Sequence, residues 1–103
     1  MNKLTIKRPD DWHLHLRDGD VLPDLVRHTA RQFSRALVMP NLRPPVTTVE
    51  QALSYKKRIH EAAKHVGFSD FQALMTLYLT DMTLPSEILK AKENGIIGVK
   101  LYP

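Results

Sequence analysis

The apolar residues of this chain follow two spacings in turn, and this alternation predicts strands separated by helices. Strands show short apolar runs or an apolar residue at every second position. Four segments have this character, namely 11–16, 36–39, 71–78 and 96–102. Between them, buried-type positions recur every three or four residues, which is the spacing of one helix face. The first helical set is Leu22, Leu25, Val26, Thr29 and Phe33, and the second is Ala52, Tyr55, Ile59, Ala62 and Val66.

Residues that begin and end helices stand at the edges of these sets. Thr48, followed by Gln51 three positions later, has the form of a capping box, in which each side chain accepts a backbone N–H group. Gly67 follows the second set, where a residue with left-handed backbone conformation commonly ends a helix. Pro85 suits the first turn of a third helix, which is expected to end near residues 94–95.

The order of strands and helices is typical of an α/β fold with a parallel sheet. The doubly wound sheet and the (β/α)8 barrel both have this order. The Gly-rich phosphate loop of a dinucleotide-binding sheet is missing after the first core strand. Polar residues instead stand at the ends of three strands, where barrel enzymes carry their working residues. We therefore predict the N-terminal part of a TIM-like (β/α)8 barrel. Because a whole barrel needs about 250 residues, the chain of 103 residues is expected to be a fragment.

Composition and charge narrow the class of protein further. The chain has 43% hydrophobic and 25% charged residues, as an ordinary globular domain does. It has no cysteine, so disulfides and thiolate metal sites are excluded and a cytoplasmic location is expected. The net charge of +4 is dispersed, and the cluster Lys56-Lys57-Arg58 fits a solvated helix face, so no nucleic-acid partner is predicted. No apolar run approaches the roughly 18 residues of a membrane span, and no signal peptide is visible.

Two histidines in the first predicted strand are the strongest candidates for chemistry. Side chains alternate between the two faces of a strand, so His13, His15 and Arg17 are expected on one face. Two imidazoles placed in this way can converge on one metal ion. A solvated or hydrogen-bonded histidine pair on an edge strand fits the same spacing, so the residues alone leave both interpretations open.

Lys100 is the least expected residue of the last predicted strand, because a charged ammonium group is costly to bury among apolar residues. Extension of the side chain to solvent, or pairing with a carboxylate, would satisfy it. A buried lysine can also lose its proton, and the neutral amine can add carbon dioxide to become a carbamate. The remaining histidines, His28, His60 and His65, fall in helical patterns and are expected at the surface without a role.

Three motifs, taken in order, resemble one known family. They are Asp-Trp-His-Leu-His-Leu-Arg-Asp-Gly at 11–19, Met-Pro-Asn-Leu at 39–42 with Pro-Pro-Val-Thr-Thr at 44–48, and Val-Lys-Leu-Tyr-Pro at 99–103. Together they are similar to dihydroorotase of the shorter, monofunctional bacterial type, within the amidohydrolase superfamily. The likeness extends over essentially the whole chain. The first motif is more specific than the His-x-His pattern that all amidohydrolases share.

This resemblance implies an activity and a set of site residues. The family reaction is the reversible cyclisation of N-carbamoyl-L-aspartate to L-dihydroorotate in de novo pyrimidine (UMP) biosynthesis. The family site holds two zinc ions (Zn2+) per full-length subunit, bridged by a hydroxide and by a lysine that carbon dioxide has carboxylated. By resemblance, His13 and His15 bind the first metal and Lys100 is the carboxylated bridge. Arg17 and Asn41 match the residues that hold the substrate carboxylate.

The resemblance also sets expectations for the whole protein. Residues 1–103 would form the N-terminal segment of a single metal-dependent hydrolase barrel domain. The acid/base aspartate and the remaining metal-binding histidines are expected beyond residue 103, so the chain alone is predicted to be inactive. The expected partner is the small-molecule substrate, with no nucleic acid and no membrane, and a homodimer is one expected assembly.

Two other functions stay open at this point. One is another cyclic amidohydrolase, such as a hydantoinase or an allantoinase. The other is a non-catalytic dihydroorotase-like barrel that acts as a structural partner of aspartate transcarbamoylase. The pair Arg17 and Asn41 argues against the first alternative. The presence of His13, His15 and Lys100 argues against the second, because a scaffold needs none of them.

Overall fold

The computed structural model describes residues 2–102, and its centre is a sheet of four parallel strands. Met1 and Pro103, the two ends of the predicted segment 1–103, lie outside the described residues. The strands stand side by side in chain order, so each connection carries the chain to the next position of the sheet. They are β1 (Asp10–Leu14), β2 (Arg35–Val38), β3 (Gln72–Tyr78) and β4 (Gly98–Lys100).

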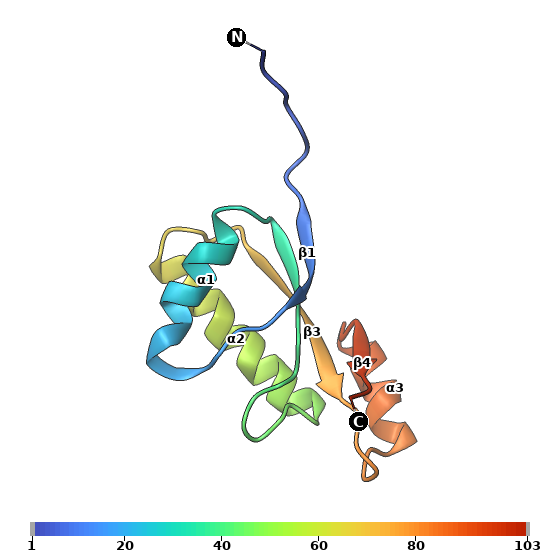
Figure 1. The fold of residues 1–103 in the computed structure, drawn as a ribbon. Helices are drawn as coiled ribbons and strands as arrows, with labels where there is room; N and C mark the ends of the chain where they lie inside the picture. Colours follow the sequence, from blue (N-terminus) through green and yellow to red (C-terminus); the bar gives the residue numbers. More distant parts are fainter. Residues whose placement is uncertain (1, 103) are drawn as a thin grey trace.

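Helices connect the strands, and the four strands with their helices form part of a TIM-like barrel. Figure 1 shows α1 and α2 together on one side of the sheet, and α2 packs on both α1 and β3. None of the helices within residues 2–102 has the length and apolarity of a membrane span. The helical elements are the 3-10 turn η1 (Gly19–Val21), α1 (Leu22–Ala30), α2 (Val49–His65) and α3 (Pro85–Glu93).

The predicted boundaries of the second and third helices are confirmed. The Thr48 hydroxyl accepts the Gln51 backbone N–H at 3.2 Å, and the Gln51 side-chain carbonyl accepts the Thr48 N–H at 3.3 Å. These two bonds are the predicted capping box. Gly67 follows α2 with φ +90°, a conformation that L-residues with a side chain rarely adopt. Pro85 is the first residue of α3.

The hydrophobic core lies between the sheet and the helices α1 and α2. The predicted stripe of α2 points into it: the side chains of Tyr55 and Ile59 are completely buried, and Val66, beyond the last helical residue, is half-buried. Burial of apolar surface is the main favourable contribution to folding, so this core fixes the strand ends that carry the candidate site. Other core members are Leu16, Val26, Ala36, Val38, Ala52, Ala62, Met75 and Leu77.

The first strand is shorter than the predicted segment 11–16. It ends at Leu14, and its register to β2 shifts between Asp11 and Leu14. The expectation that His13, His15 and Arg17 share one strand face is therefore wrong in detail, because His15 and Arg17 follow the strand. A strict alternation of faces holds only while the pairing is regular.

The last strand also differs from its prediction. The segment 96–102 is reduced to the three residues of β4, and Ile97, Val99 and Leu101 are exposed. The reason is that β4 pairs with β3 alone and is an edge strand within residues 2–102. An apolar strand pattern predicts burial on both faces only for a strand that is covered on both.

His60 departs from the surface position expected for it. Its Nε2 accepts the backbone N–H of Ala73 at 3.1 Å, so α2 is tied to the start of β3 by this side chain. Burial, followed by the charge of Lys56, lowers the pKa of His60 below its ordinary value of 6.5. A neutral ring is what this contact requires, because a protonated Nε2 cannot accept a hydrogen bond. His28 and His65 are exposed, as predicted.

Candidate active site

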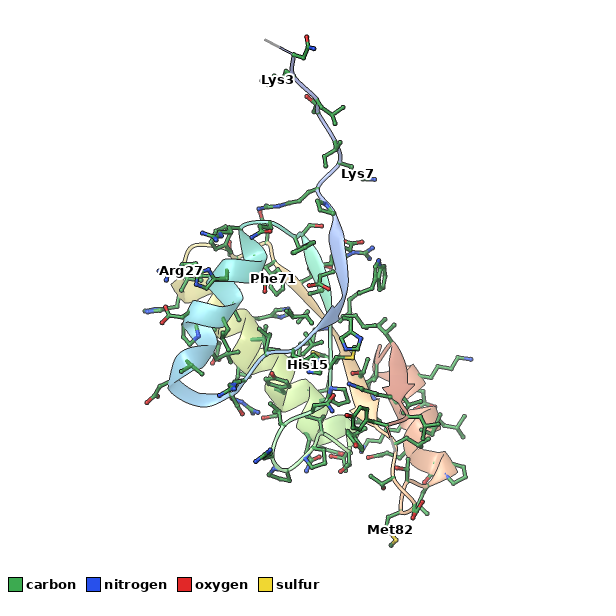
Figure 2. The ribbon with its side chains drawn as sticks, in the orientation of Figure 1. Lys3, Lys7, His15, Arg27, Phe71 and Met82 are labelled. Atoms are coloured by element: carbon green, nitrogen blue, oxygen red, sulfur yellow. The ribbon has the colours of Figure 1, made fainter. Side chains whose placement is uncertain are left out.

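The two predicted metal-binding histidines meet at the end of β1. His13 is the penultimate residue of the strand, and Figure 2 labels His15 just beyond the strand end. The Nε2 atoms of the two rings are 3.0 Å apart, and the ring centroids are 4.9 Å apart. The backbone irregularity of β1 therefore leaves the convergence of the two imidazoles intact.

This pair fits the donor set of a divalent metal ion. Its N···N distance of 3.0 Å suits an N–H···N hydrogen bond between neutral imidazoles. Two nitrogen ligands of tetrahedral zinc, each ~2.1 Å from the metal, stand about 3.4 Å apart. A shift of about 0.4 Å would thus change one arrangement into the other. Burial lowers the pKa of His15, and the charges of Lys100 and His13 lower it further. The neutral form that this favours is the form that binds metal.

Lys100 lies at the end of β4 and reaches toward the end of β2. Its Nζ donates to the Asn41 Oδ1 at 2.7 Å and lies 5.3 Å from the centre of the Tyr102 ring. The side chain is half-buried, and its strand is mostly exposed. Lys100 is therefore less buried than the apolar pattern of its strand predicts. The ammonium group is partnered by an amide oxygen from 59 positions away in the chain, a contact that no local pattern reveals.

Arg17 and Asn41, the predicted substrate-binding residues, line one cavity of about 940 Å³. His13, His15 and Lys100 are not among the residues that line it. Asn41 connects the two groups, because its side chain faces the cavity and also accepts the Lys100 hydrogen bond. The structure thus places the five predicted residues at the carboxyl ends of the parallel strands. They form a histidine pair, a lysine–asparagine pair and a single arginine.

Within residues 2–102, no three His, Asp or Glu side chains come together as a metal-binding group. The histidine pair alone leaves a zinc ion short of the four ligands usual for it. A four-coordinate zinc site therefore needs ligands other than these histidines, either from a modified side chain or from residues outside this chain. Carboxylation of Lys100 would supply carboxylate-like oxygen donors, which zinc also accepts.

Two residues that line the cavity are not among the predicted site residues. Asp18 and Arg58 both line it and form an ion pair with N···O 2.8 Å. Arg58 lies on the exposed face of α2 that its basic cluster predicts, but it also lines the cavity and pairs with Asp18, which the cluster does not reveal. The available signal was its position three residues after Tyr55 and next to Ile59, which places it at the border of the buried stripe.

The comparisons with known proteins give one consistent family. No family model matches the chain. The dihydroorotase of Delftia acidovorans is 60% identical over 102 residues, which are 99% of this chain and 29% of that protein. The crystal structure of dihydroorotase from Campylobacter jejuni superposes with a TM-score of 0.83 and 40% identity, covering 95% of this chain and 28% of that one. The chain therefore spans about 29% of the length of the curated relatives that it matches.

A more distant structure shares the fold alone. The L-hydantoinase (dihydropyrimidinase) of Arthrobacter aurescens superposes with a TM-score of 0.69 at 24% identity, over 89% of this chain and 20% of that one. Its similarity confirms the α/β barrel architecture that the sequence predicted. At this identity it carries no argument about activity.

Proposed function

We propose that this chain, which belongs to the dihydroorotase family and matches its N-terminal part, supplies the substrate-carboxylate and first-metal residues of a dihydroorotase. The proposed reaction is the reversible cyclisation of N-carbamoyl-L-aspartate to L-dihydroorotate. The observation that carries the proposal is the gathering of His13, His15, Lys100, Asn41 and Arg17 at one edge of a parallel sheet. In a (β/α)8 barrel, this edge is where active sites are built.

In this proposal His13 and His15 hold one zinc ion through their Nε2 atoms, which already converge. When bound, zinc supplies Lewis acidity and lowers the pKa of water at the site. The Lys100 ammonium would lose one proton to solvent, and the neutral amine would add to the carbon of carbon dioxide. As the N–C bond forms, one C=O electron pair would move to oxygen, and a second N–H proton would pass to solvent, which leaves a carbamate anion. Its oxygens would then serve as further metal ligands. The second zinc ion and the acid/base aspartate require residues outside this chain.

Arg17 and Asn41 would bind the carboxylate that substrate and product share. The Arg17 guanidinium is a fixed cation with a fork of N–H donors that matches a carboxylate. The Oδ1 of Asn41 accepts from Lys100, so its Nδ2 amide remains as a donor toward the cavity that both residues line. A carboxylate held in this way would fix the position of the ring amide relative to His13 and His15.

Further properties of the whole protein follow from the same proposal. We expect a cytoplasmic enzyme that acts on small molecules, without nucleic acid or membrane as a partner, and we propose a homodimer as its assembly. The hydantoinase alternative is less well supported, because relatives that share about 60% identity over nearly the whole chain are dihydroorotases.

The test is the substitution Arg17→Met in the whole protein that carries this chain, assayed with L-dihydroorotate. Loss of a charge that pairs with a buried substrate carboxylate is expected to lower kcat/KM by the equivalent of about 2–5 kcal/mol. The metal content is expected to stay unchanged, because arginine is not a metal ligand. Arg27→Met is the control, since Arg27 lies on the surface of α1 and, within residues 2–102, forms an ion pair only with Asp24. An unchanged kcat/KM in the Arg17 variant would contradict the proposal.

A further inference from the structure

The short segment that carries Arg17 is fixed on both sides of that residue. Leu16 is 5% exposed and belongs to the core. On the other side, the Asp18 carboxylate accepts the Gly19 backbone N–H at 3.0 Å and caps η1. Gly19 has φ +79°, which allows the chain to turn directly after Asp18. The Arg17 backbone therefore lies between a buried side chain and a capped turn.

Arg58 of α2 holds the same turn at two points. Its Nε donates to the Asp18 Oδ1 at 3.1 Å and its Nη2 donates to the Asp18 Oδ2 at 2.8 Å. The guanidinium is itself held, because its Nη1 donates to the Ser54 Oγ at 2.8 Å and its carbon lies 5.4 Å from the centre of the Tyr55 ring. Tyr55 is completely buried in the core. The turn is thus connected to α2, the longest helix within residues 2–102.

The Arg17 side chain, in contrast, forms no hydrogen bond or ion pair with another residue in the range 2–102, and it lines the cavity. We infer that Asp18 and Arg58 form a positioning pair that holds Arg17 in place for the substrate carboxylate. This inference rests on the proposed function. The two-point geometry matters, because a carboxylate and a guanidinium that bind in a fork fix orientation as well as distance.

Stability alone does not account for this pair. Its side chains are 42% and 38% exposed, and ion pairs at such exposure contribute little to the free energy of unfolding. Partial burial raises the pKa of Asp18. The hydrogen bonds from Arg58 and Gly19, together with the Arg58 charge, lower it by more, so the pKa of Asp18 lies below its ordinary value of 3.8. The carboxylate is therefore ionised at neutral pH, and the fork is intact there.

The experiment measures KM and kcat for L-dihydroorotate in the whole protein with Asp18→Asn, Arg58→Gln and Arg58→Lys. Each variant is expected to raise KM about 5- to 20-fold, with kcat within about twofold and an unchanged metal content. Lysine keeps the charge but cannot form the fork, so Arg58→Lys is expected to fail as a substitute. An unchanged KM in Asp18→Asn, which is nearly isosteric, would overturn the inference.

The matched control is Asp10→Asn. Asp10 and Arg35 form a comparable pair with N···O 2.6 Å and side-chain exposures of 22% and 44%. This pair lies at the start of β1 and β2, the opposite end of the sheet from the candidate site. KM is expected to stay unchanged in this variant. A rise equal to that of Asp18→Asn would mean that any lost ion pair has the same effect, and would overturn the inference.

A double-mutant cycle separates positioning from direct binding, since Arg58 also lines the cavity. If Arg58 acts through Arg17, Arg58→Gln has no further effect on kcat/KM once Arg17→Met is present. Additive losses would show that Arg58 binds substrate directly and would overturn the positioning role.

If Arg17→Met itself retains full kcat/KM, the proposed function fails together with this inference. If Arg17→Met loses kcat/KM while Asp18→Asn does not, the inference alone fails.

Discussion

Replacement of Tyr55 by phenylalanine is expected to stabilise the protein, because it removes a buried hydroxyl that has no partner. The Tyr55 side chain is completely buried, and its hydroxyl has no hydrogen-bond partner within residues 2–102. The ring is retained in the variant, and so is its contact with the Arg58 guanidinium at 5.4 Å. Only the desolvated oxygen atom is lost.

The expected gain is the difference between two costs. A buried hydroxyl without a hydrogen bond costs about 1–3 kcal/mol. Removal of one oxygen leaves a void of roughly 10–15 Å³, which at about 24 cal/mol per Å³ costs about 0.3 kcal/mol. The variant Tyr55→Phe should therefore raise the free energy of unfolding at neutral pH by about 0.7–2.7 kcal/mol.

The pH dependence of the free energy of unfolding gives a second, independent test of this prediction. Burial raises the pKa of Tyr55 above its ordinary value of 10.0, and the Asp18 charge raises it further, against a smaller opposing effect of Arg58. Above the ordinary pKa, tyrosine ionises in the unfolded chain but stays protonated in the folded one. The unfolded state is stabilised as a result, so stability falls with rising pH by about 1.4 kcal/mol per pH unit until the raised pKa is reached. Phenylalanine has no such loss, and the advantage of the variant should grow above about pH 10.

Urea unfolding of both proteins at about pH 7, about pH 9 and about pH 11 measures this difference directly. Tyr78→Phe is the control, because Tyr78 is half-buried and its hydroxyl donates to the Tyr102 carbonyl at 3.4 Å. It should not show the gain at neutral pH, because the Tyr78 hydroxyl has a partner. A Tyr55→Phe variant that is less stable than the parent, or whose advantage is the same at all three pH values, would refute the reasoning.

Three further predictions concern the proposed metal ligands His13 and His15, the proposed carboxylation of Lys100, and the start of α2. His13→Ala or His15→Ala in the whole protein should lower the metal content and abolish turnover; normal stoichiometry in both variants contradicts their role as ligands. Lys100→Ala should abolish activity, with partial recovery on addition of short carboxylic acids. For the parent, a carbon-13 spectrum of enzyme prepared with labelled bicarbonate should show a carbamate signal, and its absence contradicts carboxylation. Thr48→Ala should lower the free energy of unfolding by about 1 kcal/mol, because the Gln51 N–H loses its acceptor; an unchanged unfolding midpoint would show that the cap contributes nothing.

The features predicted best from the sequence are those set by residues close together in the chain. The capping box of Thr48 and Gln51 needs only two residues in one turn. The burial of Tyr55 and Ile59 follows from their spacing along one helix face. The end of α2 before Gly67 follows from the left-handed conformation that glycine adopts readily. Each signal is local, and each is confirmed.

The features predicted less well depend on pairing between distant segments. The end of β1 at Leu14 is set by its register with β2, which shifts inside the strand. The exposure of Val99 follows from the position of β4 at an edge, which its apolar pattern does not reveal. Asp18 and Arg58 are 40 positions apart, and a basic cluster on a helix resembles a solvated face until the opposing turn is placed.

The hydrogen bond between Lys100 and Asn41 shows how the fold brings residues from different strands into one site. Asn41 follows β2 and Lys100 ends β4, with β3 between them. Two strand spacings of about 4.8 Å separate such positions in a sheet, yet the two side chains meet at 2.7 Å. The long lysine side chain can cover that separation only when both side chains lean toward the same point.

In a closing barrel, the curvature of the sheet turns successive strand ends inward. Chain order, parallel pairing and curvature therefore bring residues from different strands to one place. For this reason, polar residues at strand ends indicated the site, although none of its contacts between strands could be predicted from the sequence.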